Sequence, residues 1–375
     1  MTSIGFLSTF PPTRCGLATF TASLSDAVAD AADVTPSVVR ILTPDESAAA
    51  AAERDDRVAG HLVNGDPQSI REAAAMLNRS GAAVIQHEYG IFGGQDGAEV
   101  ISLLEQLTVP AIIVLHTVLP NPSPHQRAVL QSVCSHASFV IVMTQHARET
   151  LLSTVTLDAR RIRVIPHGAR TPIPSVRTAP EGARPRLLTW GLISPGKGLE
   201  WSIRSVAELA ASGTLVDYVI AGQTHPKLVA EQGEAYRDSL IALVGDLGLS
   251  DQVHFVDHYL SPAALDELIG DADVVVLPYE SSDQATSGVL AEAVAARIPV
   301  VSTGFPHAIE LLSDGAGLVV PHRDPVAMAA AVSALLRGET RGTAGGTAAA
   351  ELTSWSTVGR SYVRLLGSLL AERAA

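Results

Sequence analysis

The chain contains little cysteine, little positive charge and no long apolar stretch. Its 375 residues include two cysteines, Cys15 and Cys134, too few for a disulfide framework or a zinc site. The 26 Lys and Arg against 39 Asp and Glu give a formal net charge of −13. Because a protein that reads nucleic acid normally carries a basic face, we do not expect nucleic acid as a partner.

Apolar runs such as 111–115 and 274–277 are far shorter than the ~20 residues needed to cross a bilayer. Residues 1–4 carry no basic segment of the kind that opens a signal peptide. The sequence also lacks a strongly basic amphipathic helix that would bind an anionic membrane. We therefore expect a cytoplasmic protein without membrane association.

Hydrophobic residues, in contrast, make up 47% of the chain, enough for two substantial cores at roughly 150 residues per domain. Short apolar, β-branched segments alternate with longer helical patterns, which predicts βαβ units and parallel sheets. The expected strands are 4–8, 38–42, 83–86, 111–116, 139–143 and 163–165, then 186–190, 217–221, 253–256, 274–277, 300–302 and 317–319. The main expected helices are 17–31, 201–211, 236–245, 262–269 and 289–296.

The composition changes at residues 171–185, where four prolines and a glycine show neither helical nor strand periodicity. Such a stretch predicts a linker. The sequence thus favours an α/β protein with two doubly wound, Rossmann-like domains, residues 1–170 and 186–354, that face a central cleft. Ligands of such folds bind outside the carboxyl ends of the strands.

One candidate phosphate site is the loop 191–198, which includes Gly191 and Lys197 and lies between an expected strand and an expected helix. The amino end of a helix attracts phosphate through its N–H groups and its dipole, and Lys197 adds a full charge. The spacing is not that of a P-loop. The alternative is a turn shaped by glycines, with the lysine in solvent.

A second candidate is the polar segment 281–287, which leads into a helix carrying Glu292. The N–H groups of Ser287, Gly288 and Val289 would be free to bind a diphosphate. Glu292, one turn further on, would accept hydrogen bonds from a ribose diol. The alternative is an N-cap at Thr286 or Ser287, with Glu292 complementing the helix dipole.

In the first half of the chain, the loop 87–94 contains three glycines, which suggests that its backbone approaches a ligand closely. A structural turn is the alternative. It is not a HExxH metal pair, because Ile91 stands four residues after His87. His116 and His167 each end an expected strand, and we expect both to line the cleft. The alternative for His116 is a histidine packed against the loop 120–122.

Together these segments resemble the family 4 (group 1) retaining glycosyltransferases of the GT-B fold, over essentially the whole chain. The family motif has two glutamates separated by seven residues; Glu292 matches the second, and Gln284 stands in place of the first. The loop 191–198 resembles the family's diphosphate loop, with Lys197 matching its lysine and Leu192 replacing its arginine. Residues 355–375 resemble the closing helix that crosses back to the first domain.

The resemblance implies a role for each matching residue. Catalytic roles fall to His116, Lys197 and Gln284. Donor binding falls to Arg14, Gly16, His167, Gly191, Lys197, Thr286, Ser287, Gly288, Val289 and Glu292. Acceptor binding falls to His87, Glu88, Tyr89, Phe92 and Gly93, with Tyr89 and Phe92 stacking on a sugar ring.

The activity implied is that of a hexosyltransferase moving mannose or glucose from a nucleoside diphosphate sugar, GDP-mannose or UDP-glucose, to a carbohydrate or other hydroxyl acceptor. The resemblance implies retention at the anomeric carbon, and neither a metal nor another cofactor. Two alternatives stay open: a GT-B phosphorylase or sugar-phosphate synthase, and a non-catalytic sugar-nucleotide-binding protein. Leu192 and Gln284 favour the last.

Overall fold

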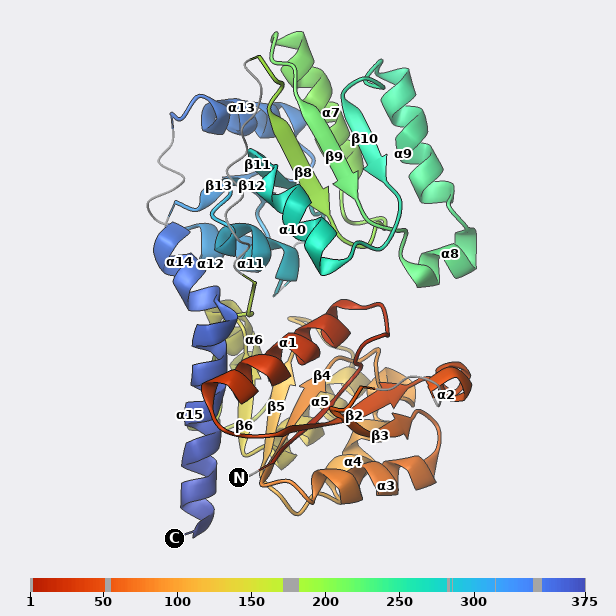
Figure 1. The fold of residues 1–375 in the computed structure, drawn as a ribbon, viewed down its shortest axis with the longest axis vertical. Coiled ribbons are helices and arrows are strands. Elements are labelled where there is room, and N and C mark those ends of the chain that lie inside the picture. Colours follow the sequence, from red (N-terminus) through yellow and green to blue (C-terminus); the bar gives the residue numbers. More distant parts are fainter. Residues whose placement is uncertain are drawn as a thin grey trace. The chain divides into compact units, whose positions relative to one another are not determined.

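The computed structural model describes residues 3–50, 55–170, 182–281, 284, 286–313, 315–339 and 346–374. It divides into two compact units (Figure 1): unit 1 is Met1–Gly168 with Trp355–Ala375, and unit 2 is Ala169–Ser354. Most of the expected linker, residues 171–181, lies outside the described part of the chain. Among the described residues, no helix is both long and apolar enough to cross a membrane.

Unit 1 is built on a sheet of parallel strands in the order β3-β2-β1-β4-β5-β6-β7. The strands are β1 (Ile4–Ser8), β2 (Pro36–Leu42), β3 (Val58–Val63), β4 (Ala82–His87), β5 (Ala111–Leu115), β6 (Phe139–Val142) and β7 (Ile162–Val164). The α-helices are α1 (Gly16–Ala31), α2 (Pro44–Ala50), α3 (Pro67–Leu77), α4 (Glu99–Leu104), α5 (Pro124–His136), α6 (Gln145–Thr154) and α15 (Trp355–Ala374), with 3₁₀ turns at Gln95–Gly97 and Ala159–Arg161. The strand order reverses between β1 and β4, and crevices at such points are where ligands bind.

Unit 2 repeats the plan with the parallel order β10-β9-β8-β11-β12-β13. The strands are β8 (Arg186–Trp190), β9 (Asp217–Ala221), β10 (Val253–Val256), β11 (Val274–Leu277), β12 (Val300–Thr303) and β13 (Gly317–Val320). The helices are α7 (Leu199–Ala211), α8 (Pro226–Gln232), α9 (Ala235–Asp246), α10 (Pro262–Gly270), α11 (Gly288–Ala295), α12 (Pro306–Leu312), α13 (Pro325–Leu336) and α14 (Gly346–Thr353). The prediction of two doubly wound parallel-sheet units is confirmed, and here the order reverses between β8 and β11.

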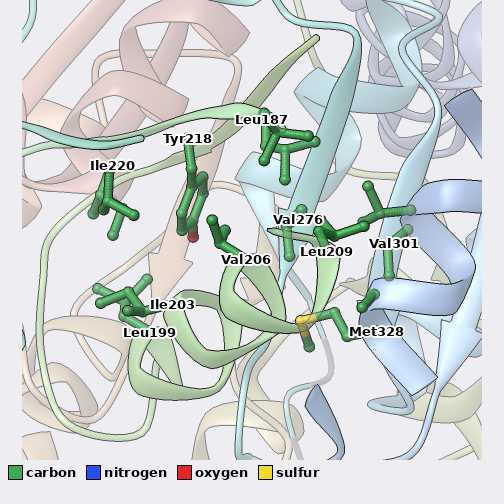
Figure 2. Close-up of a cluster of buried hydrophobic side chains, with 14 of the residues drawn as sticks. Leu187, Leu199, Ile203, Val206, Leu209, Tyr218, Ile220, Val276, Val301 and Met328 are labelled. Atoms are coloured by element: carbon green, nitrogen blue, oxygen red, sulfur yellow. The ribbon is translucent and has the colours of Figure 1, made fainter. Parts of the chain in front are cut away.

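The core of unit 2 shows why this sequence forms these elements (Figure 2). One face of α7 presents Leu199, Ile203 and Val206, which are spaced at the period of a helix. These side chains pack on Tyr218 and Ile220 of β9, and all five are at most 2% exposed. Strands covered by helices on both faces are apolar along most of their length, which made them visible in the sequence.

The last helix, α15, belongs to unit 1 and packs against α1. Its Val358 and Tyr362 enter the same buried cluster as Phe20 and Leu24 of α1. Gly359 lies at the closest approach of the two helices, where a Cβ would overlap the carbonyl oxygen of Ala27. The absence of a side chain therefore lets the helices pack closely.

Candidate active site

In unit 2, the loop 191–198 connects β8 to α7 and lies against the segment that leaves β11. The Nζ atom of Lys197 lies 4.0 Å from the centroid of the Tyr279 ring, so the lysine is not simply extended into solvent. Gly198 has φ +65°, and a Cβ there would overlap the carbonyl oxygen of Pro278. Gly191, at the start of the loop, has φ +118°, a backbone conformation that also requires glycine.

Glu280 fastens this loop in place, although nothing in the sequence pointed to it. Its backbone N–H donates to the carbonyl oxygen of Gly196 at 2.9 Å. Its carboxylate accepts hydrogen bonds from Trp201 Nε1 at 2.9 Å and Arg323 Nε at 2.8 Å. The hydrogen bond from Trp201, with the charge of Arg323, lowers the pKa of Glu280, so this carboxylate is an ionised anchor.

The amino end of α11 differs in one respect from its prediction. Ser287 is the N-cap, since its hydroxyl accepts from the N–H of Leu290 at 3.2 Å. Its own N–H is not free for a diphosphate, because it donates to Nδ1 of His307 at 2.8 Å. Gly288 and Val289 open the helix, where N–H groups have no acceptor within the helix. The N–H groups without an acceptor in the helix therefore begin at Gly288, one residue later than expected.

Gln284 and Thr286, which precede α11, are joined by a hydrogen bond. The side-chain amide of Gln284 donates to the carbonyl oxygen of Thr286 at 3.0 Å. Gln284 thus uses one side-chain donor on the backbone of Thr286, two residues before the start of α11. This hydrogen bond fixes the orientation of the Gln284 side chain.

Glu292 lies one turn into α11, beside the end of β8. Its Oε2 atom accepts a hydrogen bond from Trp190 Nε1 at 3.1 Å. Burial raises the pKa of Glu292, an effect that the Trp190 hydrogen bond and the charge of Arg170 oppose. One carboxylate oxygen of Glu292 is thus bound by Trp190 at the carboxyl edge of the sheet. Glu292 belongs to α11, the helix whose first turn contains Gly288 and Val289.

In unit 1, the predicted donor residues Arg14 and Gly16 lie at the end of the β1–α1 loop and at the start of α1, respectively. Arg14 is exposed, and Gly16 is the first residue of α1, with no atom within 4 Å of where a Cβ would lie. Arg40 of β2, which the sequence did not single out, contacts this loop. It is 5% exposed and donates a hydrogen bond to the hydroxyl of Thr13 at 3.0 Å.

His116 and His167 meet at one aromatic residue of α1. The Phe20 ring lies edge-on to both, with centroid distances of 4.8 Å to His116 and 4.9 Å to His167. His116 Nε2 is 2.7 Å from Oε1 of Gln86. Burial, with smaller contributions from neighbouring histidines, lowers the pKa of His116 to about 3, and burial lowers that of His167 to about 4. Both imidazoles are therefore neutral at pH 7.

The loop 87–94 departs from its prediction at two residues. Phe92 is 5% exposed and stacks on His87, with centroids 6.3 Å apart; as a core residue it has no free face for a sugar ring. A Cβ at Gly93 would overlap the carboxylate of Glu99, so this glycine accommodates a neighbouring side chain rather than a ligand. The backbone of the loop is shaped by packing within unit 1.

Two other polar side chains of this loop, Glu88 and His87, have perturbed pKa values. Glu88 accepts hydrogen bonds from the hydroxyl of Thr117 at 2.5 Å and the N–H of Tyr89 at 3.0 Å, and burial raises its pKa. His87 is fully buried, and burial lowers its pKa to about 4.

Four side chains at the strand-order reversal of unit 1 contain buried atoms without a hydrogen-bond partner among the described residues. They are Ser8 Oγ, Gln86 Nε2, both ring nitrogens of His87, and the hydroxyl of Tyr89. Buried polar atoms are nearly always paired, with protein or with water. Ordered water or a bound polar ligand would satisfy these atoms.

The described residues contain no cluster of three or more His, Cys, Asp or Glu side chains that could hold a metal ion. The pair Asp271 and Asp273 precedes β11, at the edge of the sheet opposite the loop 191–198. Both carboxylates accept hydrogen bonds from Arg186: Asp271 from its guanidinium at 2.7 Å and Asp273 from its backbone N–H at 2.7 Å.

Comparison with known proteins matches each unit to a glycosyltransferase family model. Residues 184–338 match the family described as "Glycosyl transferases group 1", and residues 15–171 match "Glycosyltransferase Family 4".

Among curated relatives, an alpha-D-kanosaminyltransferase of Streptomyces kanamyceticus is 30% identical over 211 residues, 53% of this chain and 51% of the relative. A D-inositol 3-phosphate glycosyltransferase of Mycolicibacterium gilvum is 32% identical over 225 residues, 56% of this chain and 47% of the relative. The chain thus spans about half the length of the curated relatives it matches.

Solved structures share the whole architecture. Anabaena HepE, crystallised with UDP and glucose, has a TM-score of 0.73 at 16% identity, covering 98% of this chain and 100% of its own. A sucrose-phosphate synthase from Thermosynechococcus elongatus has a TM-score of 0.75 at 18% identity, covering 99% and 100%. At these identities the likeness shows the fold.

Proposed function

The chain belongs to the family 4, group 1 glycosyltransferases and has the GT-B fold, and from this premise we propose that it transfers a hexosyl group from a nucleoside diphosphate sugar to a hydroxyl acceptor, with retention at the anomeric carbon. The observation that carries the proposal is the arrangement at the carboxyl edge of β8 and β11. There Lys197, the first turn of α11 and Glu292 supply an ammonium group, backbone N–H groups and a carboxylate.

These groups match the charges of the reaction. When the bond between the anomeric carbon and the diphosphate oxygen breaks, negative charge develops on the diphosphate. Lys197 and the N–H groups of Gly288 and Val289 would stabilise that charge, in the way preorganised donors stabilise a departing oxyanion. They supply the positive charge that a divalent ion provides elsewhere, so we propose that transfer proceeds without a metal.

Retention follows if the acceptor attacks from the face that the diphosphate leaves. The carbon–oxygen bond to the diphosphate breaks, a new bond to the acceptor oxygen forms on the same face, and the acceptor proton passes to the departing phosphate oxygen. No protein nucleophile is needed, and the main contribution of the protein is positioning. The neutral His116 is proposed to contact the transferred sugar.

For the donor we propose GDP-mannose or UDP-glucose, with Glu292 accepting hydrogen bonds from the ribose. UDP and glucose occupy the structure of HepE, which supports including uridine nucleotides. For the acceptor we propose a carbohydrate or other polyol bound in unit 1 beside Glu88 and Tyr89, which are half-buried and were expected to bind the acceptor. Because several curated relatives are D-inositol 3-phosphate glycosyltransferases, inositol and its phosphate belong in the acceptor screen.

The first test is a thermal-unfolding screen against UDP, GDP, ADP and their sugars. A ligand at 100 times its dissociation constant stabilises the folded protein by about 2.7 kcal/mol, which is readily detected. Positive donors are then incubated with candidate acceptors, and release of the nucleoside diphosphate is followed.

The second test uses the two lysines of the chain, Lys197 and Lys227. We expect Lys197→Ala to lower turnover about 100-fold, the typical loss when one charge-stabilising donor is removed. Lys227→Ala, on the exposed helix α8, is the matched control and should retain turnover. Near-normal turnover of Lys197→Ala would reject the proposal.

A second candidate is a protein that binds sugar nucleotides without transferring the sugar. Leu192 places no charge in the phosphate loop, and Gln284 turns its amide toward its own backbone. Tight nucleotide binding with no donor hydrolysis, no transfer to any hydroxyl acceptor and no reaction with inorganic phosphate would favour this candidate over a transferase or a phosphorylase.

A further inference from the structure

The ring beneath Lys197 is held unusually firmly. Tyr279 is 1% exposed, and its ring stacks on Phe305 with centroids 5.3 Å apart and planes inclined by 22°. Its carbonyl oxygen accepts a hydrogen bond from Thr303 Oγ1 at 2.6 Å and lies 2.9 Å from His322 Nδ1. Neither the ring nor its backbone is therefore free to move with the loop that contains Lys197.

The loop is attached to the same short segment of chain. The N–H of Glu280, the residue after Tyr279, donates to the carbonyl oxygen of Gly196, the residue before Lys197. On the other side of Lys197, Gly198 packs against Pro278 so closely that a Cβ would overlap its carbonyl oxygen. Contacts on both sides of Lys197 thus place its ammonium group over the face of the Tyr279 ring.

The face of an aromatic ring is electron-rich and attracts a cation. A lysine side chain otherwise samples many rotamers, and ordering it when a ligand binds costs affinity. In the loop 191–198, Lys197 is the single cationic residue, since Leu192 is uncharged. The affinity of this loop for an anion therefore depends on where one ammonium group is held.

We propose that Tyr279 is a positioning residue, whose ring holds the Lys197 ammonium ready to bind the diphosphate of the donor. This inference rests on the proposed function, and it assigns the ring face, not the phenolic hydroxyl, as the feature that matters. Tyr279 would act through Lys197 and not through contact with the substrate.

A double-mutant cycle tests the inference, with UDP and GDP binding measured by calorimetry. Tyr279→Leu should weaken nucleotide affinity by about 2- to 30-fold, the range that cation–π contacts contribute. Tyr279→Phe should restore affinity to within twofold of the wild type. In the Lys197→Ala background, Tyr279→Leu should have no further effect. Equal losses in the two backgrounds, or a loss in Tyr279→Phe as large as in Tyr279→Leu, would overturn the inference.

If Tyr279→Leu does not fold, a series of fluorinated phenylalanines at position 279 tests the same inference. Phenylalanine carrying successively more ring fluorines can be incorporated at position 279, because fluorine removes electron density from the ring face with little change in shape. Affinity should fall with each fluorine, and the same series at Phe305, which stacks on Tyr279, should leave it unchanged. Constant affinity across the series at position 279 would overturn the inference while leaving the proposed function intact. A wild type that binds neither nucleotide nor its sugars would overturn both.

Discussion

Two glycines on α15 allow the docking of this helix on α1 to be measured. At Gly367 no atom lies within 4 Å of a prospective Cβ, whereas at Gly359 a Cβ would overlap the carbonyl oxygen of Ala27 and lie 3.0 Å from its Cβ. In a helix interior, alanine is favoured over glycine by about 0.8–1.0 kcal/mol. Gly367→Ala should therefore stabilise unit 1 by up to about 1 kcal/mol.

Gly359→Ala gains the same helix propensity but forces the two helices apart. Overpacking a well-packed contact costs about 1–3 kcal/mol, so the substitution should be neutral or destabilising by up to about 2 kcal/mol. Urea unfolding of both variants at pH 7, followed by circular dichroism, measures the difference, which we expect to be about 1–3 kcal/mol. Equal stabilisation by the two alanines would refute the close approach of α15 and α1.

Two further predictions concern buried titratable groups. Because the pKa of His87 falls from its ordinary 6.5 to about 4, the unfolded chain binds a proton that the folded chain does not between pH 6.5 and 4. Stability should fall by about 3 kcal/mol over that range on account of this residue, and urea titrations of His87→Leu should show a correspondingly shallower pH dependence; identical slopes would contradict it. Glu292→Gln should weaken ribonucleoside diphosphate binding about 10- to 100-fold, as expected for losing hydrogen bonds to a charged group, while 2′,3′-dideoxy analogues should bind wild type and variant equally.

The strands were predictable because their signal is local. Fully buried strands such as β5 and β11 are runs of aliphatic residues between turn-forming segments, and their predicted bounds agree with the structure to within one residue. The strand β3 was missed because Gly60 and His61 interrupt its apolar pattern. Gly60 is needed there because a side chain would overlap Met76 of α3, a contact between distant residues that no local pattern reveals.

In the candidate site, too, features set by neighbouring residues were predictable, and contacts between distant residues were not. The turn before Lys197 depends on neighbours in sequence and was predicted, and the N-cap at Ser287 confirms the alternative considered for the start of α11. The partners that define their geometry, Tyr279 and His307, are more than fifteen residues away from the groups they contact. Phe92 was misjudged because a loop aromatic beside glycines suggests exposure, whereas the fold buries it against His87.

The path of the chain between the two units has a practical consequence. Gly168 lies against the ring of Trp355, and the N–H of Ala169 donates to the carbonyl oxygen of Thr353 at 2.7 Å. The exit from unit 1 and the return to it are thus adjacent, so unit 2 is an uninterrupted insertion whose ends already meet. Splicing position 168 to position 355 through a short bridge should yield unit 1 as a free-standing protein with its closing helix intact, and we expect residues 169–354 to fold as a second one. Nucleotide and acceptor binding could then be assigned to separate polypeptides.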